Sequence, residues 1–126
     1  MFRRQKNKLA YKKIIGGVIF GLAIMIAVTF LLTIFSALLN NYSLLYRQTF
    51  LLIVNLVIII LTGFMSARSV TYKGWLHGAC SGFLFTGLIL LVGSFNLSIS
   101  AGVLFLLLFL GMILGSIGGI IGVNFQ

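Results

Sequence analysis

Four long apolar runs alternate with short polar segments along the chain, and none of the runs contains Asp, Glu, Lys or Arg. A run of about 20 apolar residues is what an α-helix needs to cross the hydrocarbon core of a bilayer. Because that core offers no water to backbone polar groups, such a run is expected to be helical. The pattern therefore predicts an all-α polytopic membrane protein with transmembrane helices at about residues 14–39, 49–67, 75–95 and 101–123.

The connections between the runs are short. Residues 68–73 and 96–100 leave no room for a further element, so neighbouring runs are expected to be antiparallel. We expect residues 14–124 to form one four-helix transmembrane domain of two antiparallel hairpins, preceded by a basic head at residues 1–13.

Basic residues are concentrated on one predicted side of the membrane. The head contains six of the nine basic residues, and residues 68–73 contain Arg68 and Lys73. The two other connections, residues 40–48 and 96–100, contain only Arg47. The positive-inside rule then places both termini in the cytoplasm. We expect the head to contact the anionic inner leaflet or an acidic partner, with about 1 kcal/mol contributed by each basic residue. The lipid-facing basic residues of the head are Arg3, Arg4, Lys6, Lys8, Lys12 and Lys13.

The composition removes most kinds of catalytic site. The 126 residues include no Asp or Glu and one Cys, and 61% of them are hydrophobic. The chain therefore lacks paired catalytic carboxylates, acidic ligands for Mg²⁺ or Ca²⁺, and a thiolate cluster for zinc. We predict a non-enzymatic protein without a cofactor or a bound metal. Nucleic acid is not an expected partner either, because the basic residues are not interleaved with aromatic residues over a folded surface.

Small residues recur every four positions near one end of each run. They come early in the first and third runs and late in the second and fourth, which is the same depth in an antiparallel arrangement. Because small residues let helix backbones approach closely, we predict a bundle that is tight in its cytoplasmic half and splayed in its outer half. In the fourth run the spacing forms a glycine zipper. The predicted helix-packing residues are Gly17, Gly21, Gly63, Ala67, Gly74, Gly78, Gly82, Gly111, Gly115 and Gly119.

The starts of the first and third runs share a motif. Tyr11-Lys12 is followed by glycines at 17 and 21, and Tyr72-Lys73 is followed by glycines at 78 and 82, at an offset of 61 residues. This indicates either two hairpins related by duplication, with an axis along the membrane normal, or independent selection for glycine where helices begin.

Three further residues in the runs are chemically distinctive. We interpret the amide of Asn55 as an interhelical hydrogen-bonding group, with a substrate contact as the alternative. His77 is expected near the headgroups as a hydrogen-bonding interface residue, with a pH response or a ligand contact as the alternative. Cys80 is expected to pack as a small residue, with palmitoylation as the alternative. A His77–Cys80 catalytic dyad is not expected, because no acid is present to orient the histidine.

Two stretches resemble a known family: Lys73-Gly74-Trp75-Leu76-His77-Gly78, which follows a connection with Arg68, and the glycine-rich residues 114–124. They resemble the small, uncharacterised four-span membrane proteins of low-GC Gram-positive bacteria that include the YrzE-type proteins. The resemblance implies four spans and a location in the bacterial plasma membrane, and it brings no established activity. Members are encoded in some genomes near a translocon accessory protein, which implies a link to secretion.

These observations favour an accessory or structural membrane subunit. Its glycine-lined helices would pack against copies of the chain or against a larger membrane complex, within membrane lipids. The alternative is a small transporter or a component that handles lipids or other amphiphiles. Four-span drug exporters offer an analogy for that alternative, but they couple export to protons through a membrane Glu that this chain lacks.

Overall fold

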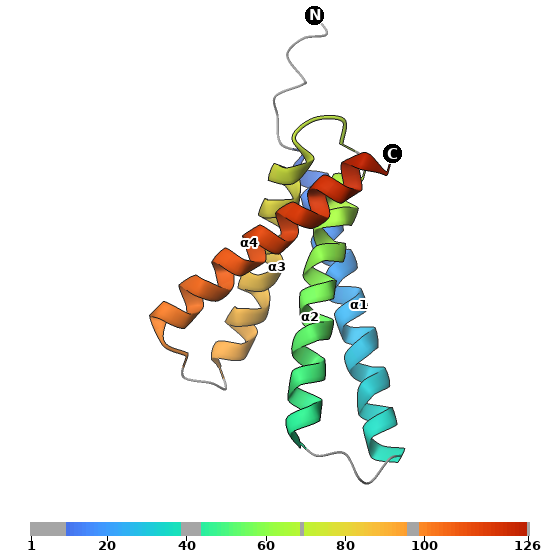
Figure 1. Ribbon diagram of the computed structural model, residues 1–126, viewed down its shortest axis with the longest axis vertical. Helices are drawn as coiled ribbons and strands as arrows, with labels where there is room; N and C mark the ends of the chain where they lie inside the picture. Colours follow the sequence, from blue (N-terminus) through green and yellow to red (C-terminus); the bar gives the residue numbers. More distant parts are fainter. Residues whose placement is uncertain (1–9, 39–43, 69, 96–98, 126) are drawn as a thin grey trace, which may run out of the picture.

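The computed structural model describes residues 10–38, 44–68, 70–95 and 99–125, and this part of the chain contains four α-helices and no strand. Each helix is long and apolar enough to cross a membrane. The prediction of an all-α protein with four membrane-crossing helices is therefore confirmed. The helices are α1 (Tyr11–Leu38), α2 (Leu44–Ala67), α3 (Gly74–Ser94) and α4 (Ala101–Asn124), as Figure 1 shows.

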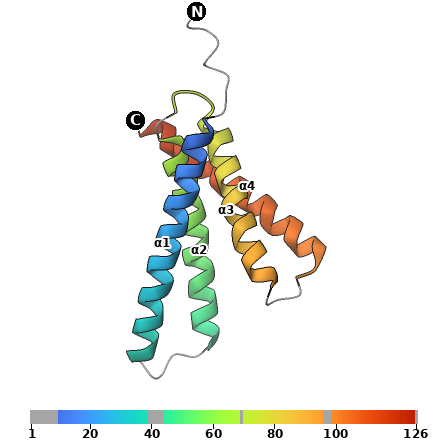
Figure 2. The ribbon, with the colours of Figure 1, turned by 180° about the vertical axis from the view of Figure 1, so that it is seen from behind.

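Consecutive helices run in opposite directions (Figures 1 and 2). The start of α1, the end of α2, the start of α3 and the end of α4 all lie at the same end of the molecule. Helices α2 and α3 are central, because each contacts all three other helices. By contrast, no described residue of α1 has its Cα within 8 Å of a Cα in α4. The outer helices α1 and α4 are therefore each held only by the central pair.

The four helices approach one another at one end and diverge toward the other (Figure 2). We call the first region the converged end and the second the open end. Every buried glycine lies at the converged end, and so do the buried residues Ile14, Val18, Ala67 and Ala79. A small apolar core of Ile58, Ile59 and Phe85 follows directly toward the open end. The converged end consists of residues 11–21, 62–67, 74–82 and 111–122.

Helix α2 is longer than its predicted span. Residues 44–48, which we expected in the connection, are helical. They contain no Pro or Gly that would end a helix, and a helix can continue past the hydrocarbon core into the headgroup region.

Helix α3 begins after a backbone reversal at Lys73. Its φ of 55° is the only positive φ of a non-glycine residue in the described part of the chain. The carbonyl of Lys73 accepts the N–H groups of Leu76 and His77 at 3.0 and 3.3 Å, which starts the helix. The left-handed turn thus directs α3 back beside α2.

Candidate functional site: the converged end

Glycine faces glycine between α3 and α4. A Cβ added to Gly78 would lie 2.7 Å from the Cα of Gly119, and a Cβ added to Gly82 would lie 2.9 Å from the Cα of Gly115. Distances this short are essentially never seen for real Cβ atoms, so the two backbones are in direct contact. The same antiparallel register places Gly74 opposite Val123, so a Cβ on Gly74 would clash with the Val123 side chain and would lie 2.9 Å from the carbonyl oxygen of Gly119.

Helix α4 uses a second glycine face against α2. A Cβ added to Gly63 would lie 2.9 Å from the Cα of Gly115, and one on Gly122 would lie 3.2 Å from the Cα of Phe64. A Cβ on Gly118 would lie 3.0 Å from the backbone nitrogen of Phe64. The end of α4 therefore packs against both α2 and α3. The rings of Phe125 and Phe64 meet edge to face, with 6.4 Å between their centroids. Gly118 and Gly122, themselves four residues apart, form a second stripe beside Gly111, Gly115 and Gly119, and they were not among the predicted helix-packing residues.

In the contact between α1 and α2, only α1 contributes glycine. A Cβ added to Gly17 would lie 2.7 Å from the Cβ of Ser66 and 2.8 Å from the carbonyl oxygen of Thr62. A Cβ added to Gly21 would lie 3.1 Å from the ring of Phe85. All ten small residues singled out from the sequence, including Ala67 at 0% exposure, are buried.

A pair of buried serines joins α2 to α3. Ser66 Oγ and Ser81 Oγ lie 2.9 Å apart, and both residues are fully buried. Each hydroxyl also lies within hydrogen-bonding distance of a carbonyl of its own helix: Ser66 Oγ to Gly63 at 2.8 Å and Ser81 Oγ to Gly78 at 3.0 Å. Neither hydroxyl depends on the other alone, so the pair adds to the contact without a large penalty if one partner is lost.

His77 joins the starts of α1 and α3. Its Nε2 accepts the backbone N–H of Ala10 at 2.9 Å, and its Nδ1 lies 3.1 Å from the carbonyl oxygen of Lys73. Because a backbone N–H can only donate, Nε2 must be the acceptor, and the proton of the neutral ring is on Nδ1. Ala10 is the residue that starts α1, since its carbonyl accepts the N–H groups of Lys13 and Ile14. The histidine is therefore buried, at 3% exposure, as a tether between two helix starts.

This geometry leaves His77 little chemistry of its own. Both ring nitrogens face backbone groups, so neither is available to take a proton from a neighbouring thiol. Cys80 is only partly buried and lines a groove between α1 and α3.

Asn55 lies on the buried side of α2 beyond the converged end. It continues the stripe of Ile58, Ile59, Thr62 and Ser66, because these positions follow at three- and four-residue steps. Its side-chain oxygen is buried and has no hydrogen-bond partner among the described residues. The buried hydroxyl of Thr86 also lacks such a partner there, but it lies against the backbone of Gly111. Asn55 is thus the clearer case of an unmet polar group.

A groove of about 480 Å³ opens between the first two turns of α1 and the second and third turns of α3, and only apolar atoms line it. Lysines 12, 13 and 73 are exposed at the same end of the molecule. The predicted lipid-facing residues Arg3, Arg4, Lys6 and Lys8 lie outside the described residues. The groove is lined by Tyr11, Ile14, Ile15, Ala79, Cys80, Phe83, Leu84 and Met112.

Comparison with known proteins gives one match. A family model described as "protein of unknown function (DUF3792)" matches residues 10–122. The chain belongs to the DUF3792 family. No curated protein and no solved structure matches it. The match begins at Ala10 and ends at Gly122, so in this DUF3792 protein it includes both the His77 tether and the glycine contacts of α4.

Proposed function

We propose that this DUF3792 protein is a non-enzymatic accessory or structural subunit that packs in the membrane against copies of itself or within a larger membrane complex. The resemblance to YrzE-type proteins extends the proposal to a secretion-linked complex in the plasma membrane of a Gram-positive bacterium. Both termini would then lie in the cytoplasm, with the converged end at the inner leaflet. Asn55 is the single observation that carries the proposal of a second chain.

The argument from Asn55 is one of hydrogen-bond satisfaction. A polar group that finds no partner in a bilayer costs several kcal/mol, and amide side chains are a common link between membrane helices. The side-chain oxygen of Asn55 is buried on the inner stripe of α2 and has no partner among the described residues. A donor from a neighbouring chain would satisfy it; because the oxygen is covered within the monomer, that donor would enter as the two hairpins part further at the open end.

The glycines have a supporting part in this proposal. The buried glycines at the converged end contact other helices of the same chain, so they set the wedge shape of the monomer. Gly93 and Gly102 differ from them, because nothing lies within 4 Å of a Cβ added at either position. They flank the turn between α3 and α4 at the open end. A helix of a second chain could approach the backbone closely there.

Replacement of Asn55 tests the proposal. The wild-type protein in native membranes should give a crosslinked oligomer or complex on native gels. Asn55→Leu should shift the protein toward the monomer, and Asn55→Gln, which keeps the amide, should retain the assembly. Thr29→Val is the matched control, because the Thr29 hydroxyl already bonds to the carbonyl of Met25 at 2.8 Å on an exposed side of α1. A wild-type protein that gives only monomer, or an assembly unchanged by Asn55→Leu, would refute the proposal.

A further inference from the structure

We infer that the groove between α1 and α3 binds an acyl chain of an anionic phospholipid, whose headgroup phosphate contacts the lysines at the converged end. This inference does not depend on the accessory role. It rests on the shape and lining of the groove and on the charge beside it.

The groove has the size of a ligand site and the chemistry of hydrocarbon. Its volume of about 480 Å³ falls within the range of about 300–1,000 Å³ that is usual for small-molecule sites. Tyr11 and Ile15 of α1 form one wall, Cys80 and Leu84 of α3 form the other, and Met112 of α4 also contributes. No polar atom is exposed in it, so a ligand that needs hydrogen bonds along its length would not be bound.

The length of the groove favours an acyl chain over a partner helix. Its wall on α3 runs from Ala79 to Leu84, which is roughly 7.5 Å at the helical rise of 1.5 Å per residue. An α-helix with its side chains is about 10–12 Å wide and needs several turns of contact to pack stably. A single hydrocarbon chain is narrower and can follow a short groove. Because the groove lies on membrane-crossing helices, lipid is also the molecule present around it.

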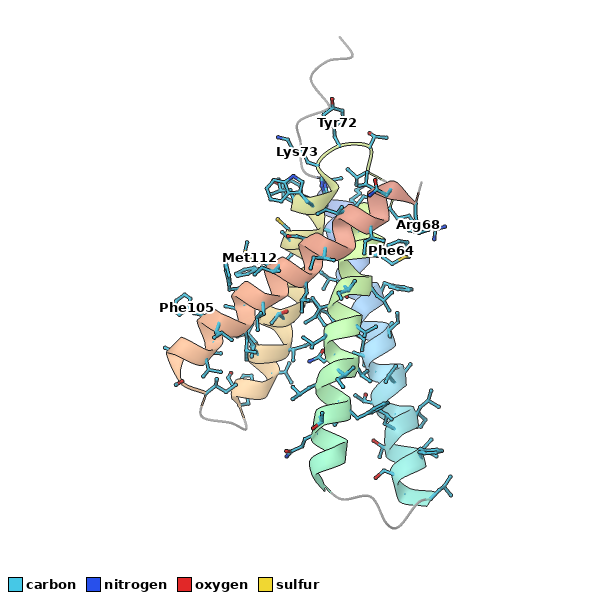
Figure 3. The ribbon with its side chains drawn as sticks, in the orientation of Figure 1. Phe64, Arg68, Tyr72, Lys73, Phe105 and Met112 are labelled. Atoms are coloured by element: carbon cyan, nitrogen blue, oxygen red, sulfur yellow. The ribbon has the colours of Figure 1, made fainter. Side chains whose placement is uncertain are left out.

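The charge at the end of the groove selects an anionic headgroup. Tyr11, on the groove wall, is followed directly by the exposed Lys12 and Lys13, and Lys73 precedes α3 at the same end (Figure 3). The chain contains no Asp or Glu, so no acidic side chain of its own can neutralise these lysines. A lipid phosphate complements them, and the long lysine side chains can reach up to it from the helix ends.

Arg68 provides a matched control for charge. It is exposed at the same end of the molecule, but Figure 3 shows it beside the ends of α2 and α4, on the other side from Lys73. Its removal lowers the net charge without touching the proposed headgroup site. Ile15 and Ile19 form a second matched pair. Both are exposed on α1, and only Ile15 lines the groove.

Native mass spectrometry of protein from nanodiscs tests the inference, with phosphatidylcholine alone compared with phosphatidylcholine plus phosphatidylglycerol. The wild type should retain phosphatidylglycerol in preference. Each of Lys12→Gln, Lys13→Gln and Lys73→Gln should weaken retention by roughly fivefold, the equivalent of about 1 kcal/mol per basic residue at an anionic surface. Arg68→Gln should leave it unchanged. Ile15→Trp, which fills the groove, should displace the lipid, and Ile19→Trp should not.

Cys80 gives an independent measurement on the unmodified chain, because it is the one cysteine and it lines the groove. Maleimide labelling of Cys80 should slow when phosphatidylglycerol is added, and the three lysine substitutions should abolish that protection. Equal retention of both lipids, or equal effects of Ile15→Trp and Ile19→Trp, would mean general contact with bilayer lipid and would overturn the inference. Protection of Cys80 that follows protein dimerisation and not lipid composition would overturn it as well.

Discussion

The two hairpins make their closest contacts at the same depth but with different residues. Between α3 and α4, glycine lies on both helices, and Gly82 meets the backbone of Gly115. Between α1 and α2, Gly17 meets the side chain of Ser66 and the backbone of Thr62. Gly17 and Gly78 occupy equivalent places in the repeated motif. The same motif in α1 and α3 therefore meets two kinds of partner helix.

The difference shows what a second glycine contributes. With glycine on both helices, the backbones themselves come into contact, and the end of α4 can sit against α2 and α3 together. With glycine on one helix, the partner's Cβ occupies the space, and α1 is held mainly by its first turns. Helix α1 is accordingly the least buried of the four: 11% of its apolar stretch is buried within the protein, against 22% for α4, 33% for α2 and 39% for α3.

Gly115→Leu should have the largest effect, because Gly115 faces α2 and α3 at once. A Cβ there would lie 2.9 Å from the Cα of Gly82, and Gly63 approaches the same residue from the other side. We expect a loss of more than about 3 kcal/mol in the free energy of unfolding, since backbone atoms cannot move aside as side chains can. Steric-trapping measurements in bicelles would give the value. Gly102→Leu is the control, as a Cβ at Gly102 meets nothing within 4 Å.

Alanine at the two equivalent glycines should separate the hairpins more finely. Gly78→Ala and Gly17→Ala should each cost about 1–3 kcal/mol through overpacking. Ser66→Gly should partly rescue Gly17→Ala, because it removes the Cβ that the new methyl group would meet. A double-mutant cycle in unfolding free energy should give a coupling of about 1 kcal/mol. Gly78→Ala has no equivalent rescue, since its partners Gly115 and Gly119 already lack a Cβ; zero coupling in the first cycle would argue against this distinction.

His77→Phe should loosen α1 alone. The change leaves the N–H of Ala10 without its acceptor, at a cost of about 1–2 kcal/mol. Hydrogen exchange should accelerate at residues 10–14 and remain unchanged in α4. Trp75→Phe, at an exposed position on the same turn of α3, controls for the aromatic substitution. Faster exchange spread evenly over all four helices would show that His77 supports the whole fold and not this one contact.

Ser81→Ala should have the smallest effect of the series. Side-chain hydrogen bonds between membrane helices contribute about 0.6 kcal/mol on average, and Ser66 keeps its bond to the carbonyl of Gly63. A change in unfolding free energy above about 2 kcal/mol would show that the serine pair is a main link between α2 and α3, beyond the usual range of such bonds.

The sequence predicts the helices and the converged end of the bundle well, because both depend on strong local patterns. Apolar length predicts membrane-crossing helices, and the glycine spacing indicates which part of each helix approaches a neighbour. It does not say which neighbour. Gly115 could have faced one helix, and its contact with both α2 and α3 depends on the crossing of α4, which no single stripe encodes.

The polar contacts were harder to predict for a related reason. We expected His77 to be an interface residue near the headgroups. Its partner is the backbone N–H of Ala10, and a backbone group cannot be recognised from the pattern of side chains. The Ser66–Ser81 bond likewise joins two residues that the sequence presents only as small. Such contacts depend on which residues of two helices lie side by side. The packing of the whole bundle determines that alignment.

The central claim is that the four helices meet at the glycine-rich end and diverge toward the other. Spin-label distances in lipid nanodiscs, on a Cys80→Ala background, test it directly with labels at residues 12 and 124 in one sample and at 37 and 102 in another. Both pairs join α1 to α4, the first at the converged end and the second at the open end. We predict a clearly shorter distance for 12–124 than for 37–102. Equal distances, or a shorter distance for 37–102, would contradict the account.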